Sequence, residues 1–317
     1  MIVDRESVIS SFTSLPKDAI PLDFIGKYTA GNQPLFVCPR TGILSSQRTM
    51  SAQDIVAYWS STLFSSASPD HYSAVNPFAQ ARLLYTLLTL ANFLSTRSDV
   101  PAEPQLCDFA TGQGVLLDLA RKHLPNWKLS ATEFTKDLAE AASSRGYKVV
   151  NEGLGLSKDS LAEALGGRPD VGVLSWTLCN CIDPLGVLQQ IHATMADGGY
   201  LCVAEGSRIM VPYRKSLKDM FSPLHPIDSH PFQFSRKSLD ALLSVSGFKP
   251  VYANRYFDSD ALVVVAQKQP YSARAASLNM DDPQDVVAFM TRWGETTEYF
   301  ENELRNLDDP TANPQRS

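Results

Sequence analysis

The sequence predicts an α/β fold in which a doubly wound sheet of seven strands follows an N-terminal helical cap and precedes a C-terminal helix. From residue 105 to about residue 267, short apolar runs alternate with segments of helical periodicity. Such alternation implies parallel strands joined by right-handed crossovers. The proline-containing connector 98–104 and Pro270 bound this region. We therefore expect three parts: a cap and substrate region in 1–100, a sheet domain in 101–269, and a C-terminal helix with a tail in 270–317.

The N-terminal part contains one short strand signal and two helix signals. An apolar run at 36–38 is followed by a turn, because Pro39 and Gly42 interrupt the pattern. Ser51 followed by Asp54 is an N-cap pattern, and apolar residues including Tyr58 and Trp59 come after it. Asn76 and Pro77 suit the cap and the first position of a second helix, whose leucines recur at helical spacing.

The sheet domain is predicted from alternating strands and helices. The five strands that we expect to be parallel are 105–109, 128–133, 147–151, 171–176 and 200–205. The helices between them are 115–123, 136–144, 159–165 and 184–195. A helix over 236–246, capped by Ser235, leads through Gly247 into the runs 251–255 and 262–266. These two runs are separated by a short polar segment, so we expect an antiparallel hairpin.

The C-terminal part begins with Asp282 and Pro283, which together suit a helix start, and the apolar residues after them fall near one face. Gly294 weakens the middle of this helix by about 1 kcal/mol. The residues after Asp308 are polar and include proline, and we expect them to be disordered.

Composition and charge restrict the possible partners and compartment. The net charge is −6, and no basic cluster of the kind that nucleic-acid phosphates require is present. The longest apolar run, 83–94, is shorter than the roughly 20 residues needed to cross a bilayer. The charged N-terminus lacks the apolar core of a secretory signal, and the five cysteines are scattered and odd in number. We expect a cytoplasmic protein with reduced thiols and neither nucleic-acid nor membrane partners.

The strongest local signal is the segment Leu106–Gly114, a strand that ends in a glycine-containing turn before a helix. In doubly wound sheets, ligands bind beyond the carboxyl ends of the strands. Gly112 and Gly114 would let the backbone approach a ligand closely, and the helix N-terminus behind them favours an anionic group. The alternative interpretation is a plain tight turn.

A carboxylate follows the next strand. Glu133 could accept hydrogen bonds from both ribose hydroxyls of an adenosine-containing cofactor, while Phe134 could lie against the adenine. The alternative is a solvated residue at the end of a strand. A dinucleotide fingerprint would need a third glycine where this sequence has Leu117, which disfavours NAD.

These motifs resemble those of class I S-adenosylmethionine-dependent methyltransferases. The segment Asp108–Gly114 resembles the family's first motif, D/E-x-G-x-G-x-G, and Glu133 matches its acidic ribose residue. Segments 170–178 and 188–203 resemble its fourth strand and the helix, G-G turn and fifth strand that follow. Ala110 replaces the first glycine, a change that a backbone at negative φ would tolerate. Asn151 and Glu152 stand where the family often has an Asp that contacts adenine.

The resemblance extends over residues 105 to 267 and implies a Rossmann-like, seven-stranded methyltransferase sheet that binds S-adenosyl-L-methionine. The cofactor-binding residues that it implies are Asp108, Ala110, Gly112, Gly114, Glu133, Phe134, Asn151, Trp176 and Leu178.

The flanking segments resemble those of sugar- and polysaccharide-modifying members. Residues 35–42 are similar to a degenerate C-P-x-C-G knuckle, and residues 230–248 to a His-containing loop and helix. Thr41 replaces the second knuckle cysteine, so Cys38 alone cannot complete a zinc site and we expect no metal. This implies methylation of a small molecule, with a sugar or glycan precursor as the first candidate and an O- or N-methylated natural product as the second. The rival hypothesis is a non-catalytic cofactor-binding or regulatory partner, and a homodimer is a further expectation.

Histidines are the candidate proton acceptors, because a hydroxyl or carbon nucleophile must lose a proton when it is methylated. His225 and His230 are predicted to be catalytic, since both lie in a loop after the fifth strand and Asp228 between them could orient one imidazole. His71 is a loop histidine of the same kind, whereas His123 and His192 are expected at the helix surface. The residues expected to bind substrate or to close over the site are Tyr72, Glu205 and Arg208, the last with Arg214 and Lys215 nearby. Cys179 and Cys181 are expected to be packing residues.

Overall fold

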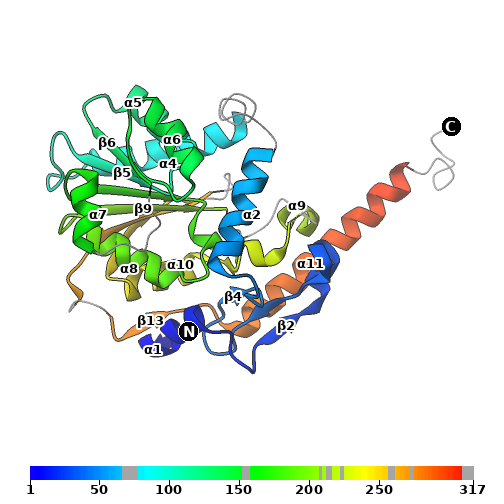
Figure 1. Ribbon diagram of the computed structural model, residues 1–317. Helices are drawn as coiled ribbons and strands as arrows, with labels where there is room; N and C mark the ends of the chain where they lie inside the picture. The colour runs from blue at the N-terminus through cyan, green and yellow to red at the C-terminus, as the bar shows by residue number, and fades with distance from the viewer. Residues whose placement is uncertain are drawn as a thin grey trace.

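The computed structural model describes residues 1–65, 77–151, 158–206, 209–211, 216–221, 225–255, 261–271 and 275–308. Figure 1 shows a sheet covered by helices on both faces, with a smaller antiparallel β-sheet and a long C-terminal helix beside it. The N-terminal segment pairs with the segment that precedes the C-terminal helix, since β1 (Ile2–Asp4) runs antiparallel to β13 (Ser277–Asn279).

The main sheet has seven strands in the order β11-β12-β9-β8-β5-β6-β7. Their bounds are β5 Gln105–Phe109, β6 Lys128–Thr132, β7 Lys148–Val150, β8 Val171–Ser175, β9 Tyr200–Glu205, β11 Phe248–Ala253 and β12 Leu262–Lys268. Strands β5 to β9 pair in parallel, whereas β12 runs antiparallel to its neighbours β9 and β11. The predicted fold class and the predicted hairpin are both confirmed.

The two faces of the sheet bury different helices. Along β12, Val263 and Val265 pack with the core beneath α4 and α5, while Val264 faces the core beneath α8 and α10. This alternation follows from the two-residue period of a strand. The helices of the sheet domain are α4 Pro77–Leu94, α5 Val115–His123, α6 Lys136–Ser144, α7 Lys158–Leu165, α8 Pro184–Thr194 and α10 Arg236–Val245.

The N-terminal part contains more β-structure than the expected helical cap. A four-stranded antiparallel sheet has the order β10-β4-β3-β2, and its edge strand β10 (Phe232–Gln233) comes from the segment that carries the histidines. Its other elements are α1 Arg5–Thr13, β2 Ile20–Leu22, β3 Leu35–Val37, β4 Leu44–Ser45 and α2 Ala52–Ser65. Short 3₁₀ and α-helical turns lie at Asp23–Tyr28, Ala30–Asn32, Leu178–Asn180, Leu217–Met220 and Ile227–Ser229. Strands of two or three residues are too short to show a period in the sequence.

Two predicted helix caps are present. Before α2, Ser51 Oγ accepts from the Asp54 backbone N–H at 3.1 Å, and the Asp54 carboxylate accepts from the Ser51 N–H at 3.1 Å. Before α10, Ser235 and Ser238 exchange the equivalent pair of bonds. Such reciprocal bonds satisfy amides that the first helical turn leaves without partners.

Helix α11 (Pro283–Asp308) begins at the predicted proline and packs on the small sheet. A Cβ atom at Gly294 would lie 3.0 Å from the Phe24 ring, so glycine lets the helix approach this ring closely. The outer half of the helix extends away from the rest of the protein (Figure 1), and Tyr299 and Phe300 are exposed there. The predicted disordered tail after Asp308 lies outside the described residues.

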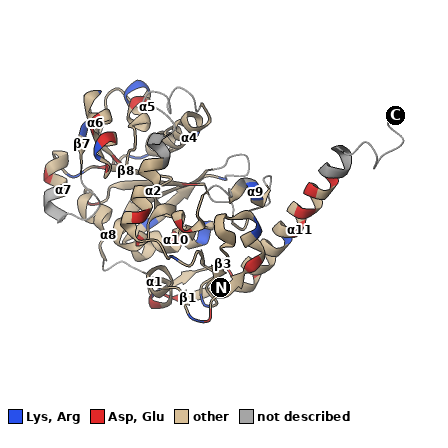
Figure 2. Ribbon diagram, turned by 45° about the vertical axis from the view of Figure 1, so that its right-hand side comes forward, with Lys and Arg blue, Asp and Glu red and all other residues tan. Residues whose placement is uncertain are grey.

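The described surface matches most sequence expectations. Figure 2 shows basic residues mixed with acidic ones over the elements in view. Among the described helices, none combines the length and apolarity that a membrane span needs. All five cysteines lie in described segments and are free thiols.

The expectation that His192 lies at the helix surface is wrong. Its side chain is buried, and its imidazole Nε2 lies 2.8 Å from the Gln269 carbonyl oxygen. The chain that leaves β12 covers this face of α8.

Candidate functional site

The loop between β5 and α5 has left-handed backbone at three alternate residues. The φ angles are +58° at Ala110, +58° at Gly112 and +73° at Gly114. The expectation of a negative φ at Ala110 is therefore wrong. The loop is held against β6, since the Ala110 and Thr111 amides donate to Thr132 Oγ1 and O at 3.1 and 2.9 Å. These bonds fix the turn although its first residue carries a side chain.

Replacing Ala110 with glycine should stabilise the protein by about 1 kcal/mol, because a left-handed conformation costs an L-residue roughly that much. Urea unfolding measures the change. Gly112→Ala is the matched variant, since a Cβ atom there meets nothing within 4 Å and only the backbone conformation opposes it. We expect that variant to be destabilised by a similar amount. Equal stability of Ala110→Gly and wild type would contradict the left-handed geometry.

The two glycines of the loop have different surroundings. A Cβ atom at Gly114 would lie 2.5 Å from Arg145 Nη2 and 3.1 Å from Ala142 Cβ, so Gly114 permits close packing of the loop on α6. The Cα of Gly112 faces open space instead. Of the two predicted cofactor-contacting glycines, Gly112 thus has room for a ligand beside its backbone.

Two buried carboxylates support this loop. Asp108 accepts a hydrogen bond from Thr111 Oγ1 at 2.6 Å, and burial raises its pKa to about 7 although this bond acts in the opposite direction. Glu133 accepts from the Gly112 and Thr135 amides at 2.7 and 2.8 Å. Burial raises the pKa of Glu133 as well, against the effect of these amides. These two amides bond to different oxygens of Glu133, and a carboxylate can accept about four hydrogen bonds in all.

The neighbours of Glu133 include an exposed aromatic ring and an amide that bonds to the backbone. The Phe134 side chain is 55% exposed next to the loop, which leaves a ring face free. Asn151 Nδ2 donates to the carbonyl oxygens of Glu133 and Phe134 at 3.0 and 3.2 Å. The Asn151 amide therefore fixes the backbone that carries these two side chains.

The end of β8 supplies the remaining predicted cofactor residues. Trp176 has a φ of +51°, a left-handed conformation of a kind that is enriched at functional sites. Its amide donates to the Ala204 carbonyl at 2.7 Å. Leu178 is fully buried, and its amide donates to Glu205 Oε1 at 2.8 Å. Leu178 thus contributes its backbone to the site, while its side chain packs in the core.

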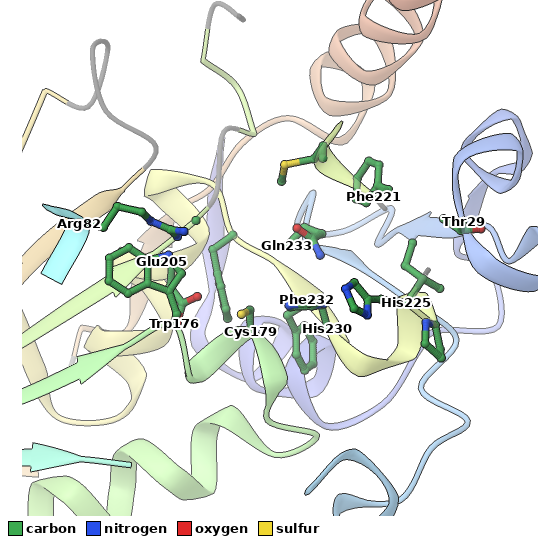
Figure 3. Close-up of a pocket in the computed structure, with 15 residues that line it drawn as sticks. Thr29, Arg82, Trp176, Cys179, Glu205, Phe221, His225, His230, Phe232 and Gln233 are labelled. Carbon is green, nitrogen blue, oxygen red and sulfur yellow. The ribbon is translucent and has the colours of Figure 1, made fainter. Parts of the chain in front are cut away.

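A cavity of about 290 Å³ lies beyond the ends of β8 and β9. Figure 3 shows Arg82, Trp176 and Glu205 at one end of it and His225 and His230 toward the other. The apolar residues of its wall include Met220, Phe221, Ile227, Phe232 and Phe234. The structure therefore brings the predicted residues Trp176, Glu205, His225 and His230 together around one space.

Helix α2 supplies two aromatic residues that the sequence did not identify as site residues. The Tyr58 hydroxyl makes a short hydrogen bond with His225 Nδ1. The Trp59 ring packs edge-on against His230 at 4.9 Å, and its Nε1 donates to the Ser229 carbonyl at 3.1 Å. Their only sequence signal was a pair of adjacent aromatic residues with polar atoms on a predicted helix.

The role expected for Asp228 is corrected by the structure. Its carboxylate accepts from the Arg48 and Thr49 amides at 3.0 and 2.9 Å and from the Thr49 hydroxyl. Burial opposes ionisation, but bonds from Ser46, Thr49 and Arg48 outweigh it and lower the pKa of Asp228. Asp228 therefore holds the turn before α2, and Tyr58 is the group bonded to an imidazole.

The two histidines differ in their surroundings. Burial disfavours the imidazolium form of His230, and the nearby His225 adds to the effect, so that the pKa of His230 is lowered to about 4. His230 Nδ1 lies 3.3 Å from Ser229 Oγ.

The predicted residues Tyr72 and Arg208 lie outside the described residues, as do His71, Arg214 and Lys215.

Comparison with known protein families gives one match. Residues 79–253 match a family model described as a methyltransferase domain, which spans more than half of the chain. The chain belongs to the class I S-adenosylmethionine-dependent methyltransferases. The strand order with its antiparallel β12 and the loop after β5 agree with the motifs that the sequence indicated. The chain is therefore an enzyme, and its cofactor is S-adenosylmethionine.

Several solved structures are similar to this methyltransferase. One is the CurJ carbon methyltransferase, with 16% identity over 69% of this chain and 66% of that one, at a TM-score of 0.48. Another is an S-adenosylmethionine-dependent methyltransferase from Aquifex aeolicus, with 13% identity over 63% of this chain and 98% of that one, at a TM-score of 0.45. A third is an O-methyltransferase family protein from Burkholderia thailandensis, with 15% identity over 68% and 69% and a TM-score of 0.44. A search of curated protein sequences found no match.

Proposed function

We propose that this enzyme methylates a neutral, mainly apolar small molecule at an oxygen or carbon that gives up a proton. The composition of the cavity carries the proposal. Arg82 and Glu205 are its only charged lining residues in the described part of the chain, and both lie at the strand end. Toward the histidines the wall is aromatic and aliphatic, which favours an apolar molecule with few polar groups.

The residues around the loop after β5 fit S-adenosylmethionine. Gly112 leaves space beside its backbone, Glu133 retains acceptor sites for ribose hydroxyls, and Phe134 offers a ring face to an adenine. The cofactor supplies an electrophilic methyl carbon bound to a positively charged sulfur. The task of the chain is to bind and orient both reactants, and such positioning supplies much of the rate of a methyl transfer.

The histidines supply candidate proton acceptors. Because its pKa is lowered to about 4, His230 is neutral at physiological pH and has a nitrogen free of a proton. His225 is oriented by its bond with Tyr58. We propose that His230 receives the proton of the nucleophile and that His225 is the second candidate for this role.

This cavity favours a natural-product-like acceptor over a sugar nucleotide. A sugar nucleotide carries phosphates, which proteins commonly bind through Arg or Lys. At the histidine end, none of the lining residues that the structure describes is basic apart from the histidines themselves. The volume of about 290 Å³ is at the lower end of ligand pockets, which suits a small acceptor.

A panel of acceptors tests this proposal. The enzyme is incubated with S-adenosylmethionine and either neutral hydroxylated aromatic compounds or nucleotide sugars, and formation of S-adenosylhomocysteine is measured. We expect turnover with members of the first group at rates at least about tenfold above those with the second, since each buried charge without a partner costs several kcal/mol. Preference for nucleotide sugars would contradict the proposal and support the sugar interpretation.

A further inference from the structure

Glu205, the last residue of β9, has one oxygen with a partner and one without. The side chain is 1% exposed and lines the cavity. Its Oε1 accepts from the Leu178 amide, but its Oε2 is buried and, among the described residues, accepts no hydrogen bond. The thiol of neighbouring Cys179 donates to Asn180 Oδ1. A buried carboxylate oxygen without a partner costs stability, so a fold retains it where a ligand completes it.

Trp176 presents a complementary atom at the same end of the cavity (Figure 3). Its Nε1 is buried and finds no hydrogen-bond acceptor among the described residues. A Cβ atom at Gly206 would lie 3.3 Å from Nε1, so a larger residue at 206 would cover the indole N–H. Within the described part of the chain, one end of the cavity therefore has an acceptor and a donor without partners, at the ends of the adjacent strands β8 and β9.

The chemistry of these two atoms selects a hydroxyl group. A hydroxyl can donate to a carboxylate and accept from an indole N–H, whereas an ammonium group can only donate and an ether oxygen can only accept. The Arg82 guanidinium lies over the Trp176 ring, 4.1 Å from its centroid, and this positive charge disfavours a cationic ligand.

We propose that Glu205 and Trp176 bind a hydroxyl group of the methyl acceptor, so that the enzyme selects neutral alcohols or phenols over ethers and amines. The inference rests on the proposed function and adds a second polar contact to that of the histidines. Burial raises the pKa of Glu205 to about 7, and the neighbouring Cys179 and Leu178 only partly oppose this, so donation from a ligand hydroxyl would stabilise the carboxylate.

The test uses three probes that share a ring system: 2-naphthylmethanol, its methyl ether and 2-naphthylmethylamine. Dissociation constants are measured by ligand-observed NMR on enzyme saturated with S-adenosylhomocysteine, whose binding is verified beforehand. Wild type should bind the alcohol at least about tenfold more tightly than either analogue, as expected for a hydrogen bond to a charged group. Glu205→Gln should remove this preference. Leu178 holds Oε1, which places the amide nitrogen at the Oε2 position, where it can donate to an alcohol or an ether alike.

Asp240→Asn is the matched control, since Asp240 also has a buried oxygen without a described partner but pairs with Arg236 on α10 and lines no part of the cavity. This variant should keep the wild-type preference. Glu205→Gln should fold normally, because it removes a buried charge, and a thermal melt verifies this.

Equal binding of alcohol and ether by wild type, or a preference that survives in Glu205→Gln, would overturn the inference. Tightest binding of the amine, or no binding of any probe, would do the same. These outcomes are read without turnover, so they are distinct from failure of the proposed function, which would appear as absent methyl transfer.

Discussion

Replacing Glu133 with alanine should weaken binding of S-adenosylmethionine and S-adenosylhomocysteine by at least about 100-fold. Two hydrogen bonds from ribose hydroxyls to a carboxylate are worth about 3 kcal/mol together, and that free energy corresponds to this factor. The variant also releases the Gly112 and Thr135 amides, which now donate to Glu133. The lost ribose bonds and the released amides should both lower cofactor affinity, and isothermal titration calorimetry measures the loss of affinity.

Glu140→Ala is the control for this measurement. Glu140 lies on α6 with 65% of its side chain exposed and pairs only weakly with Lys136, at 3.7 Å. Its removal should leave the affinity unchanged. If Glu133→Ala bound the cofactor as tightly as wild type, the ribose-binding role of this carboxylate would be wrong.

Replacing His230 with alanine should lower kcat by about 10²–10⁴-fold, the usual range for general-base assistance, while cofactor affinity stays near that of wild type. His230 lines the acceptor cavity, whose described lining includes neither Glu133 nor a residue of the loop after β5. His225→Ala should have a smaller effect, and Tyr58→Phe should resemble it, because Tyr58 acts through His225. Steady-state kinetics on an accepted substrate from the panel gives these values.

The pH dependence of kcat identifies the proton acceptor. Because the pKa of His230 is lowered, the residue loses its ability to accept a proton only as the pH falls through about 4. At saturating acceptor, kcat of wild type should therefore stay level from pH 8 to about pH 5. A fall in kcat centred near pH 7 would instead follow the Glu205 carboxyl, whose pKa is raised to about 7.

Normal turnover of both His230→Ala and His225→Ala would contradict the assignment of a histidine as the proton acceptor. It would favour an amine nucleophile that needs no base.

The sequence predicted the seven-stranded sheet well because its strands are buried, its helices are amphipathic and its caps are local. Ser51 and Ser235 could be assigned from neighbours three residues away. The four-stranded sheet could not be predicted, since β10 pairs with β4 across more than 180 residues and both strands have two residues. Pairing of that kind depends on the folded chain rather than on a local pattern.

In the candidate site, sequence motifs located the atoms that follow strand ends but not their partners. Glu133, Trp176 and Glu205 lie at the strand ends where the sequence placed them, and the ends of parallel strands meet at one edge of the sheet. Tyr58 reaches His225 only through the packing of α2, which no spacing in the sequence shows. Asp228 was assigned to an imidazole by proximity in sequence, whereas the fold turns it toward Arg48 and Thr49.

Calorimetric titration of the wild-type protein with S-adenosylhomocysteine and, separately, with NADH shows which cofactor this enzyme binds. The space beside Gly112, the acceptor sites of Glu133 and the lack of a third loop glycine at Leu117 predict one binding site for S-adenosylhomocysteine. We expect micromolar or tighter affinity for S-adenosylhomocysteine and no measurable heat with NADH. Tight binding of NADH without binding of S-adenosylhomocysteine would contradict the assignment of S-adenosylmethionine as the cofactor.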